Sequence, residues 1–321
     1  MDLEFSDKTL TAREYNFGFF EADYGLIEVS GTEAVQFLNG LITNDVKKLE
    51  SGHWMSAAFP NAQGRLLAVV RVLRLDKNFL FVTDEQTREK VFQNLFRFTF
   101  AGDFKVADLS EEFSCFAVRG NKLPRFEFKI PNADEITEAK FEKGEKGFLI
   151  DAFCAKGFEI FVPNSSKDAF AANLKHLGAN GIDEQMREVL RIECGIPKYG
   201  VDMDETTIVP ELGIKELISY NKGCYIGQEI IARIHFRGHV AKQLTGLIFE
   251  DENPDVKPNH ELKSIEGKNA GKITSVIFSQ ALNKKIALAY VRYDHLAEKN
   301  RLKVNETIAT VKDLPFIQEL S

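Results

Sequence analysis

The chain has 321 residues, of which 44% are hydrophobic and 28% are charged, a composition that excludes an intrinsically disordered chain and predicts two or three packed units. The formal net charge of -7 argues against a strong non-specific grip on nucleic acid, because such binding needs a positive field. We therefore expect weak or no direct binding of nucleic acid, although a local basic patch is compatible with an acidic protein.

Cysteine usage and the start of the chain set further expectations. Cys115, Cys154, Cys194 and Cys224 form no C-x-x-C pair, so neither a zinc finger nor a self-contained cluster site is predicted, and no tightly bound metal. The acidic N-terminus has no signal-peptide or transit-peptide pattern, and no apolar run reaches membrane-spanning length. The prediction is a soluble cytoplasmic protein without a membrane contact.

The first hundred residues mix helix and strand patterns. Residues 30–33, Ser-Gly-Thr-Glu, match a capping box in front of a helix with an apolar side over 34–41. Residues 66–75 and 79–82 predict a β-hairpin, and a second helix is expected from about residue 83.

A second unit is expected from residue 104. It holds predicted strands at 113–118, 148–153 and 158–162 and a helix over 166–178. Strands mix with amphipathic helices without regular β-α-β alternation, so the predicted fold class is α+β.

After residue 238 the pattern turns to short strands, which predict a small barrel or sandwich. These strands are expected at 244–249, 271–278, 286–290 and 308–311. The predicted organisation has four parts, of which the third holds a connecting helix and a cysteine-containing segment: residues 1–103, 104–180, 181–237 and 238–321.

The connecting helix is predicted from Asp183, a suitable N-cap, to about residue 194. Glu193 lies on it at helical spacing from three apolar residues, Met186, Val189 and Leu190. A carboxylate on an apolar stripe is costly unless it is paired. One interpretation is an ion pair with Arg187 or Arg191, or a capping contact. The other is a ligand anchor, because one carboxylate can accept two parallel N–H bonds from a planar edge such as that of a pterin.

Cys224 lies between two glycines, just before a predicted helix over 228–234. A nearby cation at Lys222 and the helix dipole would both favour its thiolate. The alternative is a small buried thiol, the usual state of a lone cysteine. His235 and His239 follow, but their spacing alone does not predict a Cys-His nucleophile.

A local positive region surrounds this segment. Over residues 222–242 four cations stand against the single acid Glu229: Lys222, Arg233, Arg237 and Lys242. Such a region suits a multiply charged anion such as the glutamate tail of a folate, and equally RNA phosphates or an acidic partner. The alternative is a solvated helix face that distant acids balance.

Residues 222–229, Lys-Gly-Cys-Tyr-Ile-Gly-Gln-Glu, followed by Ala232-Arg233, resemble the signature of the YgfZ family of folate-binding proteins. That family includes iron–sulfur assembly factors and lies within the aminomethyltransferase (GcvT-like) superfamily. Weaker matches to the family or the superfamily run along most of the chain, at residues 37–46, 61–65, 191–197, 210–213, 271–275 and 286–291.

The resemblance implies a ring of three units around a central folate pocket, with a C-terminal β-barrel. It implies tetrahydrofolate or a derivative as the cofactor, with Glu193 at the pterin edge and Arg233 near the folate. From the signature we also expect Lys222, Tyr225 and Gln228 to bind the cofactor. Cys224 is expected to be a functional thiol, in a role that the resemblance leaves open.

One position departs from the aminomethyltransferase pattern. Enzymes of that type carry a catalytic aspartate in the strand after the turn at Gly64, where this chain has Ala68 and Val69. Because Val69 cannot take or orient a proton, we expect that the chain is not an active aminomethyltransferase.

Three functions remain open. The preferred one, favoured by Cys224 together with Val69, is a folate-binding accessory protein for iron–sulfur cluster assembly or maintenance. Its partners would be iron–sulfur assembly proteins or client enzymes, including tRNA-modifying ones. The second is a folate-dependent aminomethyl transferase, which would need a replacement acid such as Asp45 or Glu211. The third is an RNA- or protein-binding module that uses the basic residues without folate.

Overall fold

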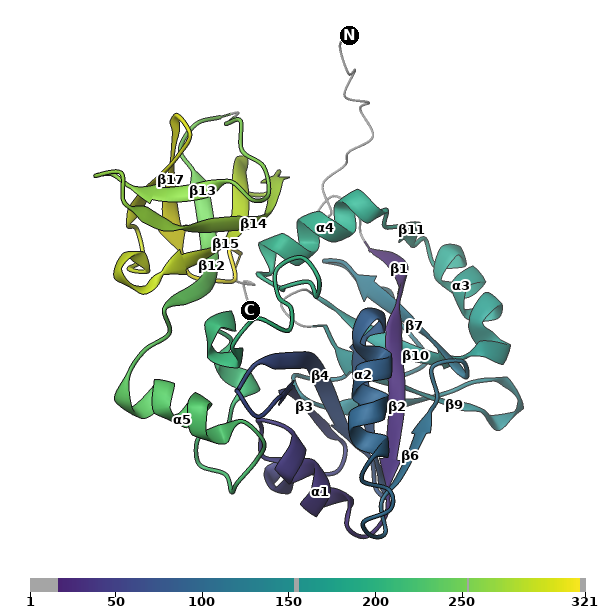
Figure 1. Cartoon of the computed structure of the whole chain (residues 1–321). Coiled ribbons are helices and arrows are strands. Elements are labelled where there is room, and N and C mark those ends of the chain that lie inside the picture. The colour runs from purple at the N-terminus through teal and green to yellow at the C-terminus, as the bar shows by residue number, and fades with distance from the viewer. Residues whose placement is uncertain (1–16, 153–155, 253, 318–321) are drawn as a thin grey trace.

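The computed structural model describes residues 17–152, 156–252 and 254–317. Two antiparallel-rich sheets pack against each other in one body, and a separate closed barrel holds the C-terminal part of the chain (Figure 1). The helices α4 (Glu184–Glu193) and α5 (Gln228–Arg237) lie in the segment that connects these two bodies. This architecture confirms the predicted α+β class and the C-terminal barrel.

The first sheet has the strand order β3-β4-β5-β2-β6, with every neighbouring pair antiparallel. The helices α1 (Ala34–Leu41) and α2 (Glu85–Phe96) cover its outer face through a core that includes Leu38 and Leu95. Its strands span Tyr24–Ser30 (β2), His53–Pro60 (β3), Leu66–Arg74 (β4), Asn78–Asp84 (β5) and Lys105–Asp108 (β6).

The second sheet has the order β11-β1-β7-β10-β9-β8, and helix α3 (Lys167–His176) covers its outer face with Phe170 and Leu174. Strand β1 pairs with β11 in parallel and with β7 in antiparallel orientation. The strands span Gly18–Ala22 (β1), Phe113–Arg119 (β7), Ile136–Lys140 (β8), Lys146–Asp151 (β9), Gly157–Pro163 (β10) and Asn180–Gly181 (β11).

The two sheets exchange strands. Strand β1 lies within residues 1–103 but pairs in the second sheet, whereas β6 lies beyond residue 103 but pairs in the first. The predicted boundary between residues 103 and 104 is therefore not a boundary between the two sheets, and the four-part division stays a prediction.

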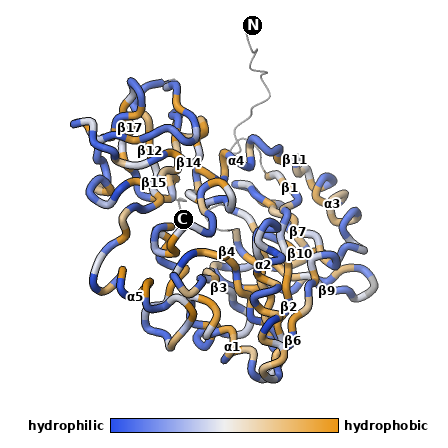
Figure 2. The backbone as a smooth tube through the Cα atoms, in the orientation of Figure 1, coloured by the Kyte–Doolittle hydropathy of each residue, from blue (hydrophilic) through white to orange (hydrophobic). Residues whose placement is uncertain are grey.

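The inner faces of the two sheets share an apolar core and one buried ion-pair cluster. Glu159 on β10 is 4% exposed and lies 2.6 Å from Arg71 of the other sheet and 2.8 Å from Arg119 of its own. Removing a carboxylate from water is costly, and two guanidinium partners offset that cost. Figure 2 shows hydrophobic stretches concentrated around β2, β4 and β10, in the middle of this body.

The barrel has six strands in the order β12-β15-β14-β13-β16-β17. Its core packs apolar side chains from several strands together, including Leu247, Ile273, Leu302 and Val311. The strands span Lys242–Phe249 (β12), Glu261–Ser264 (β13), Asn269–Ser279 (β14), Lys284–Arg292 (β15), Arg301–Val304 (β16) and Thr307–Lys312 (β17). Within the described residues, none of the helices combines the length and the apolar character needed to cross a bilayer.

The predicted capping box at residues 30–33 is wrong. Helix α1 starts at Ala34 as expected, but no side-chain hydrogen bond caps it. Thr32 instead donates from its backbone N–H and its hydroxyl to Asp103, while Glu33 accepts from the Asp103 N–H at 2.7 Å. A contact across some 70 residues replaces the local cap, because the turn before α1 packs against the turn that follows α2.

Candidate functional site

The loop over residues 221–227 crosses two turns of the N-terminal body before it enters α5. The Ile226 N–H donates to the Gly40 carbonyl at 3.0 Å. Gly227 has φ of 79°, and a Cβ atom there would lie 2.4 Å from the Asn61 carbonyl oxygen. Only glycine fits such a left-handed conformation at so close an approach. The loop thus lies against residues that precede it by about 165 to 185 positions.

Lys222 is anchored by backbone carbonyls. Its Nζ donates to the carbonyls of Ile42 at 2.8 Å and Asn44 at 2.6 Å, and it lies 4.9 Å from the centre of the Tyr225 ring. Burial lowers the pKa of Lys222 to about 8. Lys222 therefore ties the loop to the turn after α1, and its predicted contact with the cofactor stays a prediction.

Tyr225 is buried in an apolar cluster beneath the loop, and burial raises its pKa to about 12. Val69 on β4 packs against the same cluster, as do Ile218 and Tyr220. The position where the aminomethyltransferase pattern has an aspartate therefore faces apolar side chains. A carboxylate here would lose hydration, a cost that only a hydrogen bond from a donor such as a tyrosine hydroxyl of this cluster could offset.

Cys224 is exposed, three residues before the Gly227 N-cap of α5. This exposure excludes the buried-thiol alternative. Among the other cysteines, Cys115 is buried and burial raises its pKa, Cys194 is partly exposed, and Cys154 lies outside the described residues.

Two predicted ligands lie on α5 itself. Gln228 is the first residue of the helix and is partly buried, and Arg233 is exposed one and a half turns later. Both therefore follow the cysteine loop along a single rigid element.

Glu193 is the last residue of α4 and lies against the barrel. Its side chain is buried, and its Oε1 accepts a hydrogen bond of 2.5 Å from the Ser279 hydroxyl at the end of β14. Its carbonyl accepts from the Phe316 N–H at 3.0 Å. The two candidate ion-pair partners contact other acids, with Arg187 bound to Glu184 and Arg191 bound to Glu188 and Asp202.

Asp202 joins α4, the following loop and the barrel, a role that sequence reasoning missed. Its side chain is fully buried and accepts from Arg191 at 2.7 Å, from the Lys198 N–H at 3.0 Å, and from the hydroxyls of Thr274 at 2.5 Å and Ser275 at 2.7 Å. The strand partners lie more than 70 positions away, so no local spacing points to this cluster. It fixes the direction in which α4 delivers Glu193.

The two candidate replacement acids differ in their surroundings. Burial raises the pKa of Glu211, whose carboxylate accepts a 3.2 Å hydrogen bond from the Ile208 N–H and whose charge acts on the buried phenol of Tyr290. Asp45 accepts from the Lys47 N–H at 3.2 Å and lies 3.9 Å from the Lys48 ammonium. Glu211 is therefore a buried carboxylate whose raised pKa suits a general acid.

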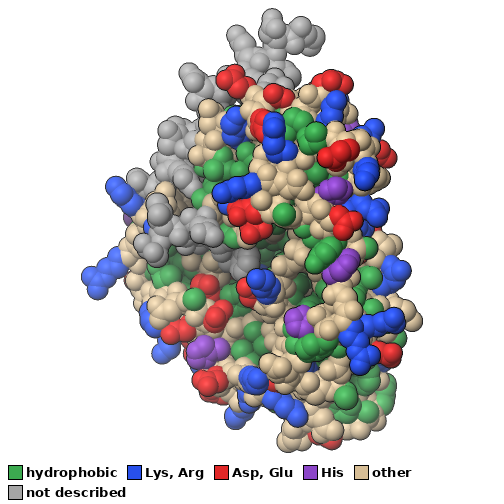
Figure 3. Space-filling model, turned by 90° about the vertical axis from the view of Figure 1, so that its left-hand side faces the viewer, with side chains coloured by type: hydrophobic (Ala, Val, Ile, Leu, Met, Phe, Trp, Pro, Cys, Tyr) green, Lys and Arg blue, Asp and Glu red, His purple; other side chains and the backbone are tan. Residues whose placement is uncertain are grey.

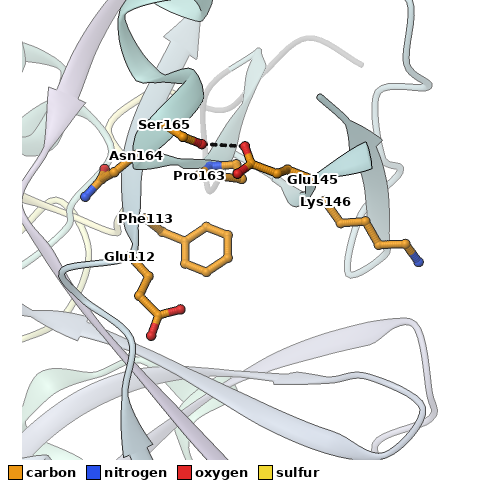
Figure 4. A pocket seen from close by; sticks show the side chains of 7 residues that line it. All are labelled: Glu112, Phe113, Glu145, Lys146, Pro163, Asn164 and Ser165. Atoms are coloured by element: carbon orange, nitrogen blue, oxygen red, sulfur yellow. Dashed lines mark hydrogen bonds between the residues drawn. The ribbon is translucent and has the colours of Figure 1, made fainter. Parts of the chain in front are cut away.

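A surface groove of about 420 Å³ lies elsewhere, beside the ends of β7 and β10 (Figure 4). It includes none of the residues predicted to bind the cofactor, and its lining consists of Glu112, Phe113, Glu145, Lys146, Pro163, Asn164 and Ser165. The described part of the chain also brings no three His, Cys, Asp or Glu side chains together in a way that could hold a metal ion.

Comparison with known proteins gives consistent results. Residues 12–136 match the model of the GCVT N-terminal domain, and residues 242–317 match that of the glycine cleavage T-protein C-terminal barrel domain. The aminomethyltransferase of Thermoanaerobacter pseudethanolicus is 26% identical over 306 residues, covering 89% of this chain and 81% of that protein. The aminomethyltransferase of Rubrobacter xylanophilus is 28% identical over 284 residues, covering 85% and 76%.

A solved structure shows the same fold. The crystal structure of the glycine cleavage system aminomethyltransferase T from Bartonella henselae superimposes with a TM-score of 0.84 at 21% identity, covering 96% of this chain and 88% of that one. The predicted arrangement with a C-terminal barrel is thereby confirmed.

Proposed function

Because the chain belongs to the GcvT-like aminomethyltransferase superfamily, we propose that it binds a reduced folate, tetrahydrofolate or one of its derivatives, where α4 meets the barrel. Glu193 carries this proposal. It is a buried carboxylate at the junction of two bodies, oriented by the Ser279 hydroxyl and by the Asp202 cluster behind it. A carboxylate fits the donor edge of a pterin, because it can accept two parallel N–H bonds.

The exposed arginine on α5 would serve the opposite end of the ligand. Arg233 lies on a face that also presents Arg237, and a guanidinium fits the carboxylates of a folate's glutamate tail. Lys222, Tyr225 and Gln228 would position this helix and its loop for the ligand. Tetrahydrofolate binding to wild type and to Glu193→Ala, measured by calorimetry, tests the assignment, and equal affinities would refute it.

Of the activities open to such a protein, we place aminomethyl transfer first. It is the activity named for both curated relatives, and the buried Glu211 supplies an acid with a raised pKa that does not depend on position 69. The test is formaldehyde or aminomethyl release from a lipoyl carrier in the presence of tetrahydrofolate. We expect Glu211→Gln to abolish turnover while tetrahydrofolate still binds. Absence of turnover in the wild type would remove this activity.

The second candidate is an accessory role in iron–sulfur cluster assembly or maintenance, with assembly proteins or client enzymes, including tRNA-modifying ones, as partners. Two observations favour it: the apolar surroundings of Val69 and the exposed thiol of Cys224. A cluster normally takes four ligands, so the others would come from a partner, a second copy or a small thiol.

Complementation distinguishes this role from transfer. A deletion strain carrying Cys224→Ser should show low activity of a [4Fe–4S] enzyme, whereas Cys194→Ser should restore it. Full rescue by Cys224→Ser would show that the thiol is dispensable and would end the accessory proposal.

A further inference from the structure

The solvent-facing side of α5 and the adjoining barrel edge form a surface that is both basic and aromatic. We call it the α5 surface and define it by Arg233, Phe236, Arg237, His239, Arg292 and Tyr293. All six residues are exposed, Phe236 by 65% and Tyr293 by 48%. Figure 3 views the molecule from this side and shows basic, histidine and hydrophobic side chains next to one another in its lower right part.

The α5 surface is continuous although it draws on two bodies. His239 follows the last residue of α5 by two positions, and its ring stacks on Tyr293 with 3.6 Å between ring centres and 10° between planes. The Tyr293 N–H donates to the Ala241 carbonyl at 3.0 Å, which fixes the barrel edge beside the end of the helix. The helix and the edge therefore present one face.

The arginines of this surface are available to a ligand. Arg233 and Arg237 stand one helical turn apart, and Arg292 lies directly opposite Lys242 in the β12–β15 ladder. The Lys242 ammonium is turned to the Tyr290 ring, 4.5 Å from its centre, and interacts with the charges of Asp204 and Glu211, so Arg292 is the cation of this pair that is left for a ligand. Among the residues that the structure describes, none of the three arginines forms an ion pair. Glu229 and Asp294 are exposed acids close to them in sequence, and the exposed Asp204 lies near Lys242.

Contacts between neighbouring rings fix the orientation of the aromatic side chains on and beside this surface. Tyr220 and His235 stack with 3.6 Å between ring centres and 13° between planes, and Phe236 meets His235 edge-on at 4.7 Å. Together with the His239–Tyr293 pair, they offer aromatic faces beside cationic groups. Exposed rings next to a positive track are typical of proteins that bind single-stranded nucleic acid, in which bases stack on the rings and phosphates meet the cations.

We propose that the α5 surface binds single-stranded nucleic acid, in addition to the folate function proposed for the buried site. A duplex hides its bases from such rings, and an acidic polypeptide needs the cations but not the flat aromatic faces. The arrangement therefore favours an unpaired strand over both. The net charge of the whole chain predicts a low affinity for nucleic acid only where binding is non-specific and acts at long range. A local basic surface can still bind nucleic acid.

The test is fluorescence anisotropy of the full chain with a labelled 12-nucleotide single strand, as RNA and as DNA of the same sequence, and with the RNA duplex, from 50 to 300 mM salt. We expect the single strands to bind at least about 10-fold more tightly than the duplex. Phe236→Ala should weaken single-strand binding roughly 10-fold with an unchanged salt slope, because it removes stacking. R237Q/R292Q should lower the slope by about 1.4, because each phosphate contact on a single strand contributes about 0.7.

K263Q/K268Q is the matched control, since it removes two exposed charges from β13 and the turn after it, on the far side of the barrel. It should bind like the wild type, and both this control and Phe236→Ala should keep the wild-type melting temperature and tetrahydrofolate affinity. No single-strand binding at 50 mM salt, or equal losses in the control, would overturn the proposal. Polyglutamate serves as a competitor for the labelled strand. If its binding is lost in R237Q/R292Q but unchanged in Phe236→Ala, the surface binds an acidic protein instead.

Discussion

The carboxylate of Glu193, at the end of α4, accepts a hydrogen bond of 2.5 Å from the hydroxyl of Ser279, at the end of barrel strand β14. This contact joins the connecting helix to the barrel. It also orients Glu193, the residue of α4 that the sequence predicts as a ligand anchor. Its consequence is that the barrel contributes to the proposed folate site without supplying a charge.

Glu193→Ala should lower the affinity for tetrahydrofolate roughly 10- to 100-fold, because a hydrogen bond to a charged group contributes about 1.5–3 kcal/mol. Ser279→Ala should cause a smaller loss, since it only releases the carboxylate from its orientation. Calorimetry measures both. Glu184→Ala on the same helix, in which the lost carboxylate is exposed, serves as the control and should bind normally.

Asp202→Ala should destabilise the fold by about 3–5 kcal/mol, because Arg191 keeps only the more exposed Glu188 as an ion-pair partner and the buried Ser275 hydroxyl loses its acceptor. Urea unfolding measures the free energy. Arg301→Ala breaks the exposed pair with Glu250 and should cost only about 0.2–1 kcal/mol. A loss for Asp202→Ala as small as that of the control would show that the cluster does not hold α4 to the barrel.

Cys224 should react with Ellman's reagent in the native protein far faster than Cys115. The first thiol is exposed, whereas the second is buried with a raised pKa and should react only on unfolding. Mass spectrometry of the labelled peptides identifies the sites. Cys224→Ser should remove the fast phase at its site, and rapid labelling of Cys115 would contradict the buried position of β7.

Lys222 should make the free energy of unfolding increase as the pH rises from 8 to about 10. The pKa of Lys222 is about 8 in the folded chain, below its ordinary value of 10.5. Between these values the unfolded chain binds more protons, so the free energy of unfolding rises with pH. Lys222→Met keeps the apolar stem and should show a smaller rise between pH 8 and 10 in urea unfolding.

Tyr225 limits the pH range of that experiment to values below about 10. Its pKa is raised to about 12, so the folded state retains a proton that the unfolded chain loses above pH 10, and stability then falls. An equal pH response in wild type and Lys222→Met would contradict the buried position of the ammonium.

Gly227→Ala should destabilise the protein by about 2 kcal/mol or more, because alanine would combine an unfavourable φ of 79° with a clash against the Asn61 carbonyl. Gly223→Ala lies in the same loop, where a Cβ meets nothing within 4 Å, and should be nearly neutral. Thermal melting of the pair separates them. Equal melting temperatures would show that the loop does not dock on residues 61–64.

Two apolar runs were predicted as strands and are strands in the structure. Residues 66–75 contain β4 and residues 308–311 lie within β17, because β-branched and other apolar residues favour a pleated, buried segment. Strand β1 was missed. It has five residues and its place is set by pairing with β7, almost a hundred positions away, for which a single sequence carries no local signal.

The capping box shows the opposite failure. Residues 30–33 have the right residue types at the right spacing, yet Asp103 takes the polar contacts that a local cap would have made. A tertiary contact overrides a local motif wherever two turns pack together, because both arrangements satisfy the same backbone groups.

For the site, the chain alone determined that Glu193 is buried and that Cys224 precedes a helix, since helical periodicity and glycine placement act through neighbouring residues. Only the tertiary structure decided that Ser279 meets the carboxylate, that Asp202 anchors the helix, and that the Lys222 ammonium faces the carbonyls of residues 42 and 44. Local geometry sets which way a side chain points. What it meets there depends on how distant segments close against one another.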